Sequence, residues 1–453
     1  MKKRLPLYTL PAILVLAWPT MLEQLLQTAV QYIDTAMVGS LGTDAVAAVG
    51  STTTVNWLVG STISAAGIGF LSYISQAFGA GDGKRARRAS AQSVTAVLVL
   101  GIFFTALTLS LSPFVPVWMQ VDPGVQKLSA AYFFILYAPM LPRCATIIFG
   151  TVLRAAGDSK TPMLTGVAVN VTNVILNFFL IYPTRTVTVF GYSIKLCGAG
   201  LGVIGAGLAS AAAFTLGGVL ITVSLLRHQK ISPRGFSIRP DGEILRPCLR
   251  VALPNAGQRF ITSFGYVVFA AAVNSLGEIS TAAHTIANTV ESAFYIPGYG
   301  MQSAAATLSG NAKGAGDERL FRDTTRMIIF VETLLMILSG GLLFAFAPGM
   351  VRLFSDDAEV MLLGVAVLRM VALSEPFYGV SIVIEGMLQG LGKTLLPFAV
   401  NVIGMWGIRI VGTLICVYLL GMGLVSAWAC MISHNLLLFA VFTVYYLRGR
   451  LIK

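Results

Sequence analysis

The segment "SLGTDAVAAVGSTTTVNWLVGSTISAAGIGFLSYISQAFGAGD" spans residues 40–82, and "SLGEISTAAHTIANTVESAFYIPGYGMQSAAATLSGNAKGAGD" spans residues 275–317. Aligned without a gap, they agree at twelve of 43 positions, including SLG at the start and GAGD at the end. The two segments are 235 residues apart, and the same offset pairs Pro19 with Pro254 and Gly157 with Gly392. The sequence therefore predicts that one structural unit occurs twice in the chain.

The composition indicates that this unit lies in a membrane. The chain has 453 residues, of which 56% are hydrophobic and 11% are charged. A helix needs about 20 mainly apolar residues to cross a bilayer. Segments of this kind predict twelve spans, six in each half, at residues 10–36, 47–77, 89–117, 126–152, 161–182, 199–226, 247–272, 282–310, 325–349, 360–388, 396–419 and 424–447.

The even number of spans in each copy decides how the copies are related. Both copies enter the membrane in the same direction, so the repeat is parallel, about an axis along the membrane normal. We expect an all-α polytopic membrane protein with two six-helix lobes, residues 1–226 and 247–453, joined by a cytoplasmic linker at 227–246. Such duplication is typical of transporters, although a duplicated bundle can also serve stability alone.

The distribution of charge predicts the orientation in the membrane. The net charge is +12, which in a soluble protein would suggest nucleic-acid binding. With the amino terminus inside, however, 23 of the 31 Lys and Arg lie in cytoplasmic segments and four lie outside. This is the positive-inside pattern, so we expect cytoplasmic termini and no nucleic-acid partner. The amino-terminal apolar run lacks a small-residue cleavage site, and we interpret it as the first span.

The sequence lacks the motifs of an enzyme or a metal protein. The five cysteines and three histidines are scattered without ligand spacing, which predicts no metal site and no disulfide framework. Neither GxxxxGK[ST], HExxH nor GxSxG occurs, and "GLGVIG" at 200–205 opens a span, where it indicates close helix packing. We therefore expect no enzyme and no cofactor, with energy supplied by an ion gradient or by a partner.

Asp34 lies within the first predicted span and is the single carboxylate of "LLQTAVQYIDTAMVGSLG", residues 25–42. Its counterpart in the second copy is Phe269, so the fold of the repeated unit does not need an acid there. An ionisable group inside a membrane usually faces a cavity or a partner, and a proton or a small cation is the natural companion of a carboxylate. A structural ion pair or contact with water is the alternative. Asp34 is the first candidate for an ion-binding residue.

Two further features accompany Asp34 in the amino-terminal half. Asn170, Asn173 and Asn177 lie along one face of the fifth predicted span. Their amides suit a bound ion or a proton relay, and equally well hydrogen bonds between helices. Pro19 precedes Asp34 by fifteen residues on the same predicted helix, where a proline permits a bend. We expect Pro19 to be a hinge, although Pro254 shows that both copies have this proline.

The carboxy-terminal half has acids of its own. Glu291 and Glu375 are expected to face a substrate cavity, and their counterparts in the first copy are Asn56 and Met140. Charge pairing is the alternative, because Arg259, Arg369 and Arg409 lie in the same half. Glu332 and Glu385 are expected near the cytoplasmic ends of their spans, where hydrated carboxylates are common.

Several fragments together resemble the multidrug and toxic compound extrusion (MATE) family, closest to its bacterial DinF-like branch and with features of its NorM branch. They are "YIDTAMVGSLG" (32–42), "LRAAGDSKTPM" (153–163), "NVTNVILNFFLIY" (170–182), "GVIGAGLAS" (202–210), "SLGEISTAAHTIAN" (275–288) and "LSEPFYGVSIVIEGMLQGLGKTLLPF" (373–398). The resemblance covers both halves. It implies a V-shaped twelve-helix antiporter that exports cationic or amphipathic drugs in exchange for protons or sodium.

The resemblance also implies roles for single residues. Asp34 matches the acid of the first helix that carries the coupling ion, and Pro19 matches the proline at which that helix bends. Asn173 and Ser210 match polar positions around the acid. The chain departs from the pattern twice, because Asn177 replaces a second aspartate frequent in DinF-like members and Thr262 replaces a glutamate of NorM-like members.

Two functions remain open on the sequence. The first is an ion-coupled exporter of organic cations in the bacterial plasma membrane, acting as a monomer on small cationic or amphipathic substrates. The second is a lipid-linked-oligosaccharide flippase of the same superfamily, which fourteen spans and cavity arginines would favour. For the exporter we expect coupling to protons. Sodium needs several hard oxygen ligands with compensating negative charge, and Asp34 is the only carboxylate in its predicted group.

Overall fold

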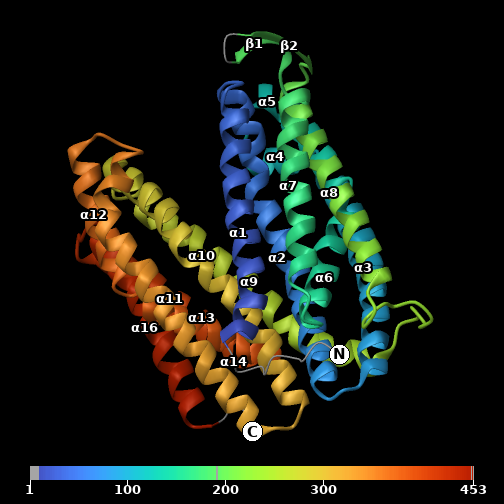
Figure 1. Ribbon diagram of the computed structural model, residues 1–453. Coiled ribbons are helices and arrows are strands. Elements are labelled where there is room, and N and C mark those ends of the chain that lie inside the picture. Colours follow the sequence, from blue (N-terminus) through green and yellow to red (C-terminus); the bar gives the residue numbers. More distant parts are fainter. Residues whose placement is uncertain (1–9, 190–191, 450, 452–453) are drawn as a thin grey trace. The chain divides into compact units, whose positions relative to one another are not determined.

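The computed structural model describes residues 10–189, 192–449 and 451. In the amino-terminal half the helices are α1 (Leu10–Gly39), α2 (Thr43–Gly79), α3 (Gly83–Leu111), α4 (Val115–Trp118), α5 (Pro123–Tyr137), α6 (Met140–Ala155), α7 (Lys160–Leu180) and α8 (Gly202–Arg227). In the carboxy-terminal half they are α9 (Gly242–Asn274), α10 (Glu278–Gly314), α11 (Glu318–Arg352), α12 (Ala358–Ala372), α13 (Glu375–Gly390), α14 (Leu395–Ile403), η1 (Gly404–Ile410), α15 (Val411–Leu414), η2 (Ile415–Leu419) and α16 (Leu424–Leu447). Each predicted span coincides with a helix or with a run of consecutive helices (Figure 1).

The internal repeat extends to the helix boundaries. Helices α2 and α10 begin and end at equivalent positions of the repeat, and the same holds for α5 with α12 and for α6 with α13. The shared GAGD sequence has a packing explanation where α2 meets α10. A Cβ on Gly79 would lie 1.9 Å from the carbonyl oxygen of Asn311, and one on Gly314 would lie 2.0 Å from that of Gln76. Both glycines are needed because each backbone approaches the other too closely for a side chain.

The fourth and tenth predicted spans are each broken in the middle. Helices α5 and α6 meet at a bend of 49°, and α12 and α13 meet at a bend of 54°. Pro139 lies at the first break and Pro376 directly after the second, and a proline removes a backbone donor and disfavours a continuous helix. Because the bends occur at equivalent positions, the break is a property of the repeated unit.

The long helices have the length and hydropathy of membrane spans in most cases. Among the described residues, seven single helices and the continuous run from α14 to η2 could cross a membrane by length and composition, which makes eight spans, or ten if each bent pair counts as one. Helices α9 and α10, which coincide with the seventh and eighth predicted spans, are not among them, and α10 carries Glu278, His284, Glu291 and Lys313. Two of the twelve predicted spans are therefore long helices of lower hydropathy.

A β-hairpin occupies the connection between α7 and α8. Strands β1 (Pro183–Val189) and β2 (Tyr192–Ala199) pair antiparallel, with Arg185 opposite Leu196. In Figure 1 the hairpin continues beyond the adjacent ends of α7 and α8. The β-branched residues of "PTRTVTV" favour this extended conformation, and the hairpin is the only sheet in the described part of the chain.

The described residues fall into two compact units. The amino-terminal unit comprises Leu22–Phe70 and Gly83–Leu245, and the carboxy-terminal unit comprises the chain up to Met21, Leu71–Asp82 and the chain from Arg246 onward. Helix α1 is thus divided between the units two residues after Pro19. The predicted lobes follow the sequence repeat instead, and their boundaries stay a prediction.

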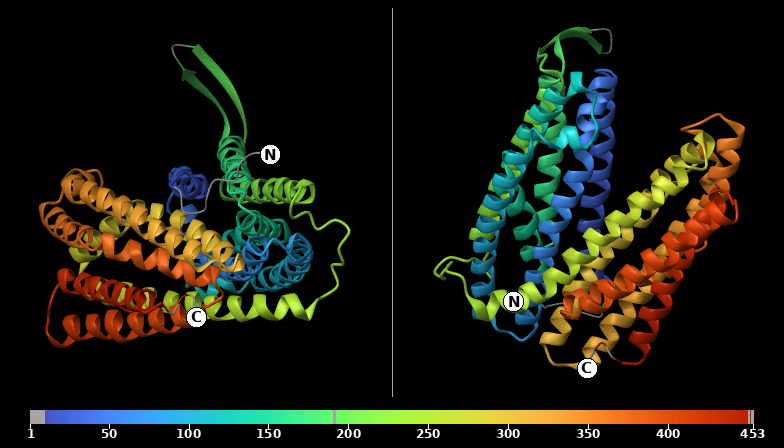
Figure 2. Two further views of the ribbon diagram at one scale, coloured as in Figure 1. Left: turned by 60° about the horizontal axis from the view of Figure 1, so that its bottom comes forward. Right: turned by 180° about the vertical axis from the view of Figure 1, so that it is seen from behind.

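The segment after α8 belongs to the amino-terminal unit, where it runs as an extended loop (Figure 2). Polar side chains of α3 hold it. Arg88 forms an ion pair with Asp241 at 2.6 Å, and the Gln92 amide donates to the carbonyl oxygens of Ser237 at 3.2 Å and Arg239 at 2.8 Å. The predicted cytoplasmic linker is therefore fastened to a helix of this unit.

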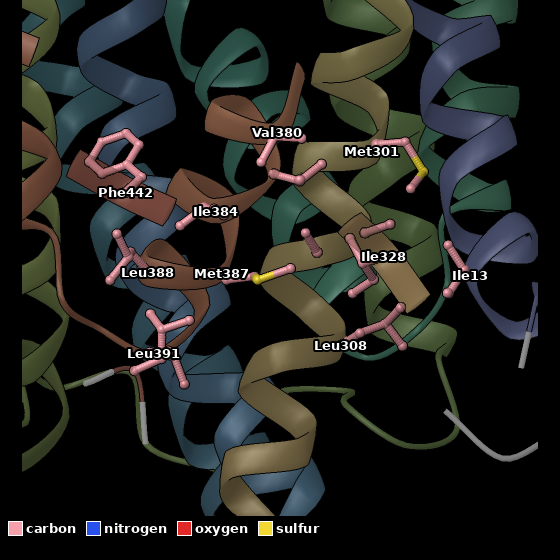
Figure 3. Packing of buried hydrophobic residues seen from close by; sticks show 14 of the residues in the cluster. Ile13, Met301, Leu308, Ile328, Val380, Ile384, Met387, Leu388, Leu391 and Phe442 are labelled. Carbon is pink, nitrogen blue, oxygen red and sulfur yellow. The ribbon is translucent and has the colours of Figure 1, made fainter. Parts of the chain in front are cut away.

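The core of the carboxy-terminal unit lies between α10, α11, α13 and α16 (Figure 3). Met301, Ile328, Ile384 and Phe442 meet there, and Ile13 of α1 joins them. Small residues bring the helices together, as in other membrane proteins. A Cβ on Gly390 would lie 2.0 Å from the carbonyl oxygen of Ala306, so α13 packs directly against the backbone of α10.

Candidate functional site

The side chain of Asp34 is partly buried on α1 and accepts a hydrogen bond from α7. The Asn177 amide nitrogen donates to Asp34 Oδ1 at 2.7 Å. Asn177 is 2% exposed, and its Oδ1 atom has no hydrogen-bond partner among the described residues. Two polar residues that are far apart in the sequence are therefore in direct contact.

Asn173 and Ser210 extend this group to a third helix. In the orientation that satisfies both polar atoms of its amide, the Asn173 nitrogen lies 2.9 Å from Asp34 Oδ1 and 3.1 Å from Oδ2. Its oxygen then accepts from the Ser210 hydroxyl of α8 at 3.0 Å. In the described structure no hydrogen bond joins Asn170 to these residues. Three of the four predicted companions of Asp34 thus lie with it.

This arrangement distinguishes the two protonation states of Asp34. An ionised carboxylate only accepts hydrogen bonds, and the amides of Asn177 and Asn173 supply donors. A protonated carboxyl needs an acceptor, and the free Oδ1 of Asn177 offers one if that amide turns over. Gaining or losing a proton therefore rearranges the contact between α1 and α7.

Pro19 lies within a continuous α1, in which it removes one backbone donor. Near it, the Thr20 hydroxyl donates to the carbonyl oxygen of Leu16 at 3.4 Å. The expected hinge role of Pro19 stays a prediction.

Three acids are buried in the carboxy-terminal unit. Glu291, Glu332 and Glu375 are 5%, 0% and 1% exposed, and they come from α10, α11 and α13. No hydrogen bond reaches the carboxylate oxygens of Glu332 or Glu375 in the described part of the chain. The expectation that Glu332 is hydrated near a helix end was wrong, because α11 begins at Glu318 and carries this residue deep into the bundle.

Two glycines pack closely against the Glu332 carboxyl. A Cβ on Gly379 would lie 2.9 Å from Glu332 Oε1, and one on Gly298 would lie 3.0 Å from the same atom. Since Gly379 follows Glu375 by one turn of α13, the Glu332 carboxyl lies against the helix that begins with Glu375.

Three arginines of this unit contact aromatic rings or an amide rather than the acids. Arg409 lies over the rings of Tyr266 and Phe269, at 4.8 Å and 4.2 Å from the ring centroids. Arg369 lies over Phe344, and Arg259 donates to Asn255 Oδ1 at 3.0 Å. Within the described ranges, no direct ion pair joins these three arginines to a carboxylate.

Glu385 has polar partners rather than water alone. Its carboxylate accepts from Gln258 at 3.0 Å, Gln389 at 3.3 Å and Asn401 at 3.3 Å.

In the amino-terminal unit, Arg154 forms an ion pair with Glu23 at 2.6 Å. This pair was not predicted, although Glu23 and Arg154 are equivalent to Gln258 and Gln389 in the repeat.

Comparisons with known proteins place the chain in a family. The MatE family model matches residues 19–179 and 254–415, and these matches begin at the equivalent prolines of the two copies of the repeat, Pro19 and Pro254. The chain belongs to the MatE family.

Relatives and solved structures agree with this placement of the MatE protein. It is 26% identical to "Probable multidrug resistance protein NorM" of Thermotoga maritima, over 96% of this chain and 91% of the relative. A MATE transporter in complex with MaD3S has a TM-score of 0.88 at 23% identity, covering 97% of this chain and 95% of the other. A MOP superfamily transporter from Pyrococcus furiosus, described as having a binding pocket of reverse polarity, has a TM-score of 0.85 at 23% identity over the same shares of the two chains. The all-helical MATE fold that the sequence predicted is thereby confirmed.

The predicted site residues of this MatE-family chain thus form separate groups. Asp34, Asn173, Asn177 and Ser210 lie together, and Asn170 is not bonded to them in the described structure. Glu291 and Glu375 lie buried in the other unit, and their role toward a substrate stays a prediction. Among the described residues, no group of three or more His, Cys, Asp and Glu could hold a metal ion.

Proposed function

We propose that this MatE-family membrane protein is a proton-coupled antiporter that exports organic cations or amphipathic drugs by alternating access. It would act in the bacterial plasma membrane, as a monomer, with both termini in the cytoplasm and with no cofactor besides the coupling ion. The names of relatives as multidrug resistance proteins support the substrate class. The observation that carries the coupling role is the single carboxylate of Asp34, joined to α7 by amides.

Coupling follows from the chemistry of this group. When Asp34 is ionised, the amides of Asn177 and Asn173 tie α1 to α7. When Asp34 binds a proton, one of its oxygens becomes a donor, and the hydrogen bonds between the two helices have to rearrange. A proton that moves down the membrane potential contributes about 2.3 kcal/mol per 100 mV to this change.

A proton suits this group better than sodium. The hydrogen bonds to Asp34 come from amide nitrogens, and Asp34 is the only carboxylate among them. Sodium would need several oxygen ligands, so both amides would have to reverse. A proton needs only the carboxyl and a path to water.

The substrate is proposed to meet the acids of the carboxy-terminal unit. Glu291 and Glu375 would attract a cation that enters from the cytoplasm, and aromatic residues such as Tyr295 and Tyr299 suit flat cationic molecules. The alternative of a flippase has no support in the relatives reported above, and the exporter is retained.

Proteoliposomes with an imposed pH gradient and no sodium test this proposal. We expect the gradient to drive uptake of a cationic dye, and Asp34→Asn to lower the rate at least tenfold because the amide mimics a permanently protonated acid. Asp44→Asn, at an exposed acid in the first turn of α2, is the matched control and should retain transport. Near-normal uptake by Asp34→Asn, or transport driven by sodium and not by pH, would contradict proton coupling through Asp34.

A further inference from the structure

Arg143 is an arginine inside the fourth predicted span that the proposed mechanism does not use. It lies in the first turn of α6, directly after the bend from α5. Its guanidinium carbon is 5.0 Å from the centroid of the Phe214 ring of α8 and 5.8 Å from that of the Tyr137 ring of α5. A Cβ on Gly60 of α2 would lie 3.7 Å from its Nη2 atom. The positive charge is therefore held between three other helices of the amino-terminal unit.

No acid balances this charge among the described residues. Arg143 forms no ion pair with a carboxylate there, and the ionisable groups close to it are Tyr132, Tyr137 and Cys144. A charged group inside a membrane is costly and usually pairs with an opposite charge. The aromatic rings attract the guanidinium, but they do not replace an anion.

Two buried polar atoms at this place lack partners. Nη1 of Arg143 and the hydroxyl of Tyr137 have no hydrogen-bond partner in the described part of the chain, and Tyr137 is 0% exposed. Buried polar atoms in a folded protein are normally hydrogen-bonded, so an exception calls for an explanation. Both atoms are able to donate a hydrogen bond, and this points to a ligand that accepts.

The repeat supplies an internal comparison. Arg143 corresponds to Tyr378 in the second copy, so the fold of the repeated unit does not need a cation at this position. Three residues earlier the pattern is reversed, because Met140 of the first copy corresponds to Glu375. The first turn after the bend thus carries a cation in one copy and an acid in the other.

The chemistry of the guanidinium selects the class of ligand. Its planar donors match the two oxygens of a carboxylate, with which arginine forms paired hydrogen bonds. A single positive charge favours a monoanion over a phosphate with two charges. The rings of Phe214 and Tyr137 beside the charge suit a flat aromatic acid.

We propose that Arg143 and the Tyr137 hydroxyl form a binding site for the carboxylate of an aromatic acid. The carboxylate has two conceivable sources, a free organic acid or the acidic group of a larger amphipathic substrate. Only the second source rests on the proposed export function. The site shares no hydrogen bond with Asp34 in the described structure.

Fluorescence anisotropy on the purified protein in detergent tests the site with two dyes. Rhodamine B is a zwitterion with one carboxylate, and rhodamine B ethyl ester is a cation with the same ring system. We expect Arg143→Gln to weaken binding of rhodamine B at least tenfold without weakening binding of the ester. Arg143→Lys keeps the charge but loses the planar donors, and it should restore part of the affinity for rhodamine B.

Lys127→Gln is the matched control, because it removes one positive charge from an exposed position of α5 in the same unit. It should bind both dyes as the wild type does. If Arg143→Gln does not fold, Arg143→Tyr replaces it, since tyrosine occupies the equivalent position in the second copy.

Benzoate and benzamide distinguish the two sources, since they share a flat ring and differ in charge. Displacement of rhodamine B by sodium benzoate and not by benzamide, with sodium chloride holding the ionic strength constant, would assign the site to a free acid as well. If benzoate does not displace the dye and rhodamine B still depends on Arg143, the carboxylate belongs to a larger substrate.

Two results would overturn the proposal. The first is equal affinity of the wild type and Arg143→Gln for rhodamine B. The second is an equal loss of affinity for both dyes in that variant, which would mean that Arg143 supports the fold rather than a carboxylate. These measurements use no ion gradient, so a failure of proton coupling through Asp34 would leave them unchanged, and the two proposals fail separately.

Discussion

At the scale of single residues, the charged groups inside this protein are not shared between the two copies of its repeat. Asp34 corresponds to Phe269, Glu332 to Val97 and Glu375 to Met140. Each position is thus packed by an apolar residue in one copy, so the fold does not need the acid. Each copy therefore carries destabilising acids at positions where the other copy has apolar residues.

This comparison predicts the effect of removing two buried acids. Glu332→Val and Glu375→Met place the residues of the first copy in positions whose carboxylate oxygens lack donors among the described residues. A buried polar group without a hydrogen bond costs about 1–3 kcal/mol. We expect each variant to raise the free energy of unfolding by a comparable amount, measured as a higher thermal midpoint in detergent.

Glu359→Gln, at an exposed acid in the first turn of α12, serves as the control and should leave the midpoint unchanged. A lower midpoint for both variants would mean that the two carboxyls hold the unit together through a bound ion or through water.

At the scale of elements, α1 is the helix that is divided between the two units. Its first part packs in the core of the carboxy-terminal unit through Ile13, Leu16 and Ala17, and its second part carries Asp34 in the amino-terminal unit. The division falls after Met21, close to Pro19. A bend at this proline would let one part move while the other stays packed.

Pro19→Ala tests the hinge. Alanine restores a backbone donor and is more favourable than proline in a helix interior by about 3 kcal/mol. We expect a normally folded protein with at least tenfold slower export of a cationic dye, because α1 resists bending. Pro254→Ala, at the equivalent proline of α9, should have a smaller effect, since α9 carries no counterpart of Asp34. Equal transport by the wild type and Pro19→Ala would remove the hinge from the mechanism.

At the scale of the whole molecule, the asymmetry of Lys and Arg predicts which side of the membrane each connection faces. The segment at 228–241 should be cytoplasmic, and the β1–β2 hairpin should be outside. The chain carries a native probe, because Cys197 is exposed on β2 while Cys144 and Cys248 are buried. An impermeant maleimide on intact cells should label Cys197.

In a chain without native cysteines, Arg234→Cys should react with the same reagent only after the cells are opened, since Arg234 is exposed in the linker. Labelling of this position in intact cells would reverse the predicted topology.

The sequence by itself determined the features that depend on neighbouring residues or on a long repeat. The apolar segments predicted the spans, since a bilayer demands about 20 apolar residues in a row. The constant offset between the two copies predicted the paired helices, and Asp34 stood out because a carboxylate is rare in such surroundings. The breaks in the fourth and tenth spans and the hairpin were not predicted, because each depends on a few residues within a longer apolar or polar segment.

Only the tertiary structure decided which polar groups meet. Asn177 reaches Asp34 across 143 residues and Asn401 reaches Glu385 across 16, while Asn170, on the same predicted stripe as Asn177, forms no bond to the acid in the described structure. Periodicity places a side chain on a face of its helix but leaves open which helix packs there. The burial of Glu332 and the amides around Glu385 follow from that packing. The charges were visible in the sequence, and their partners were set by contacts between helices.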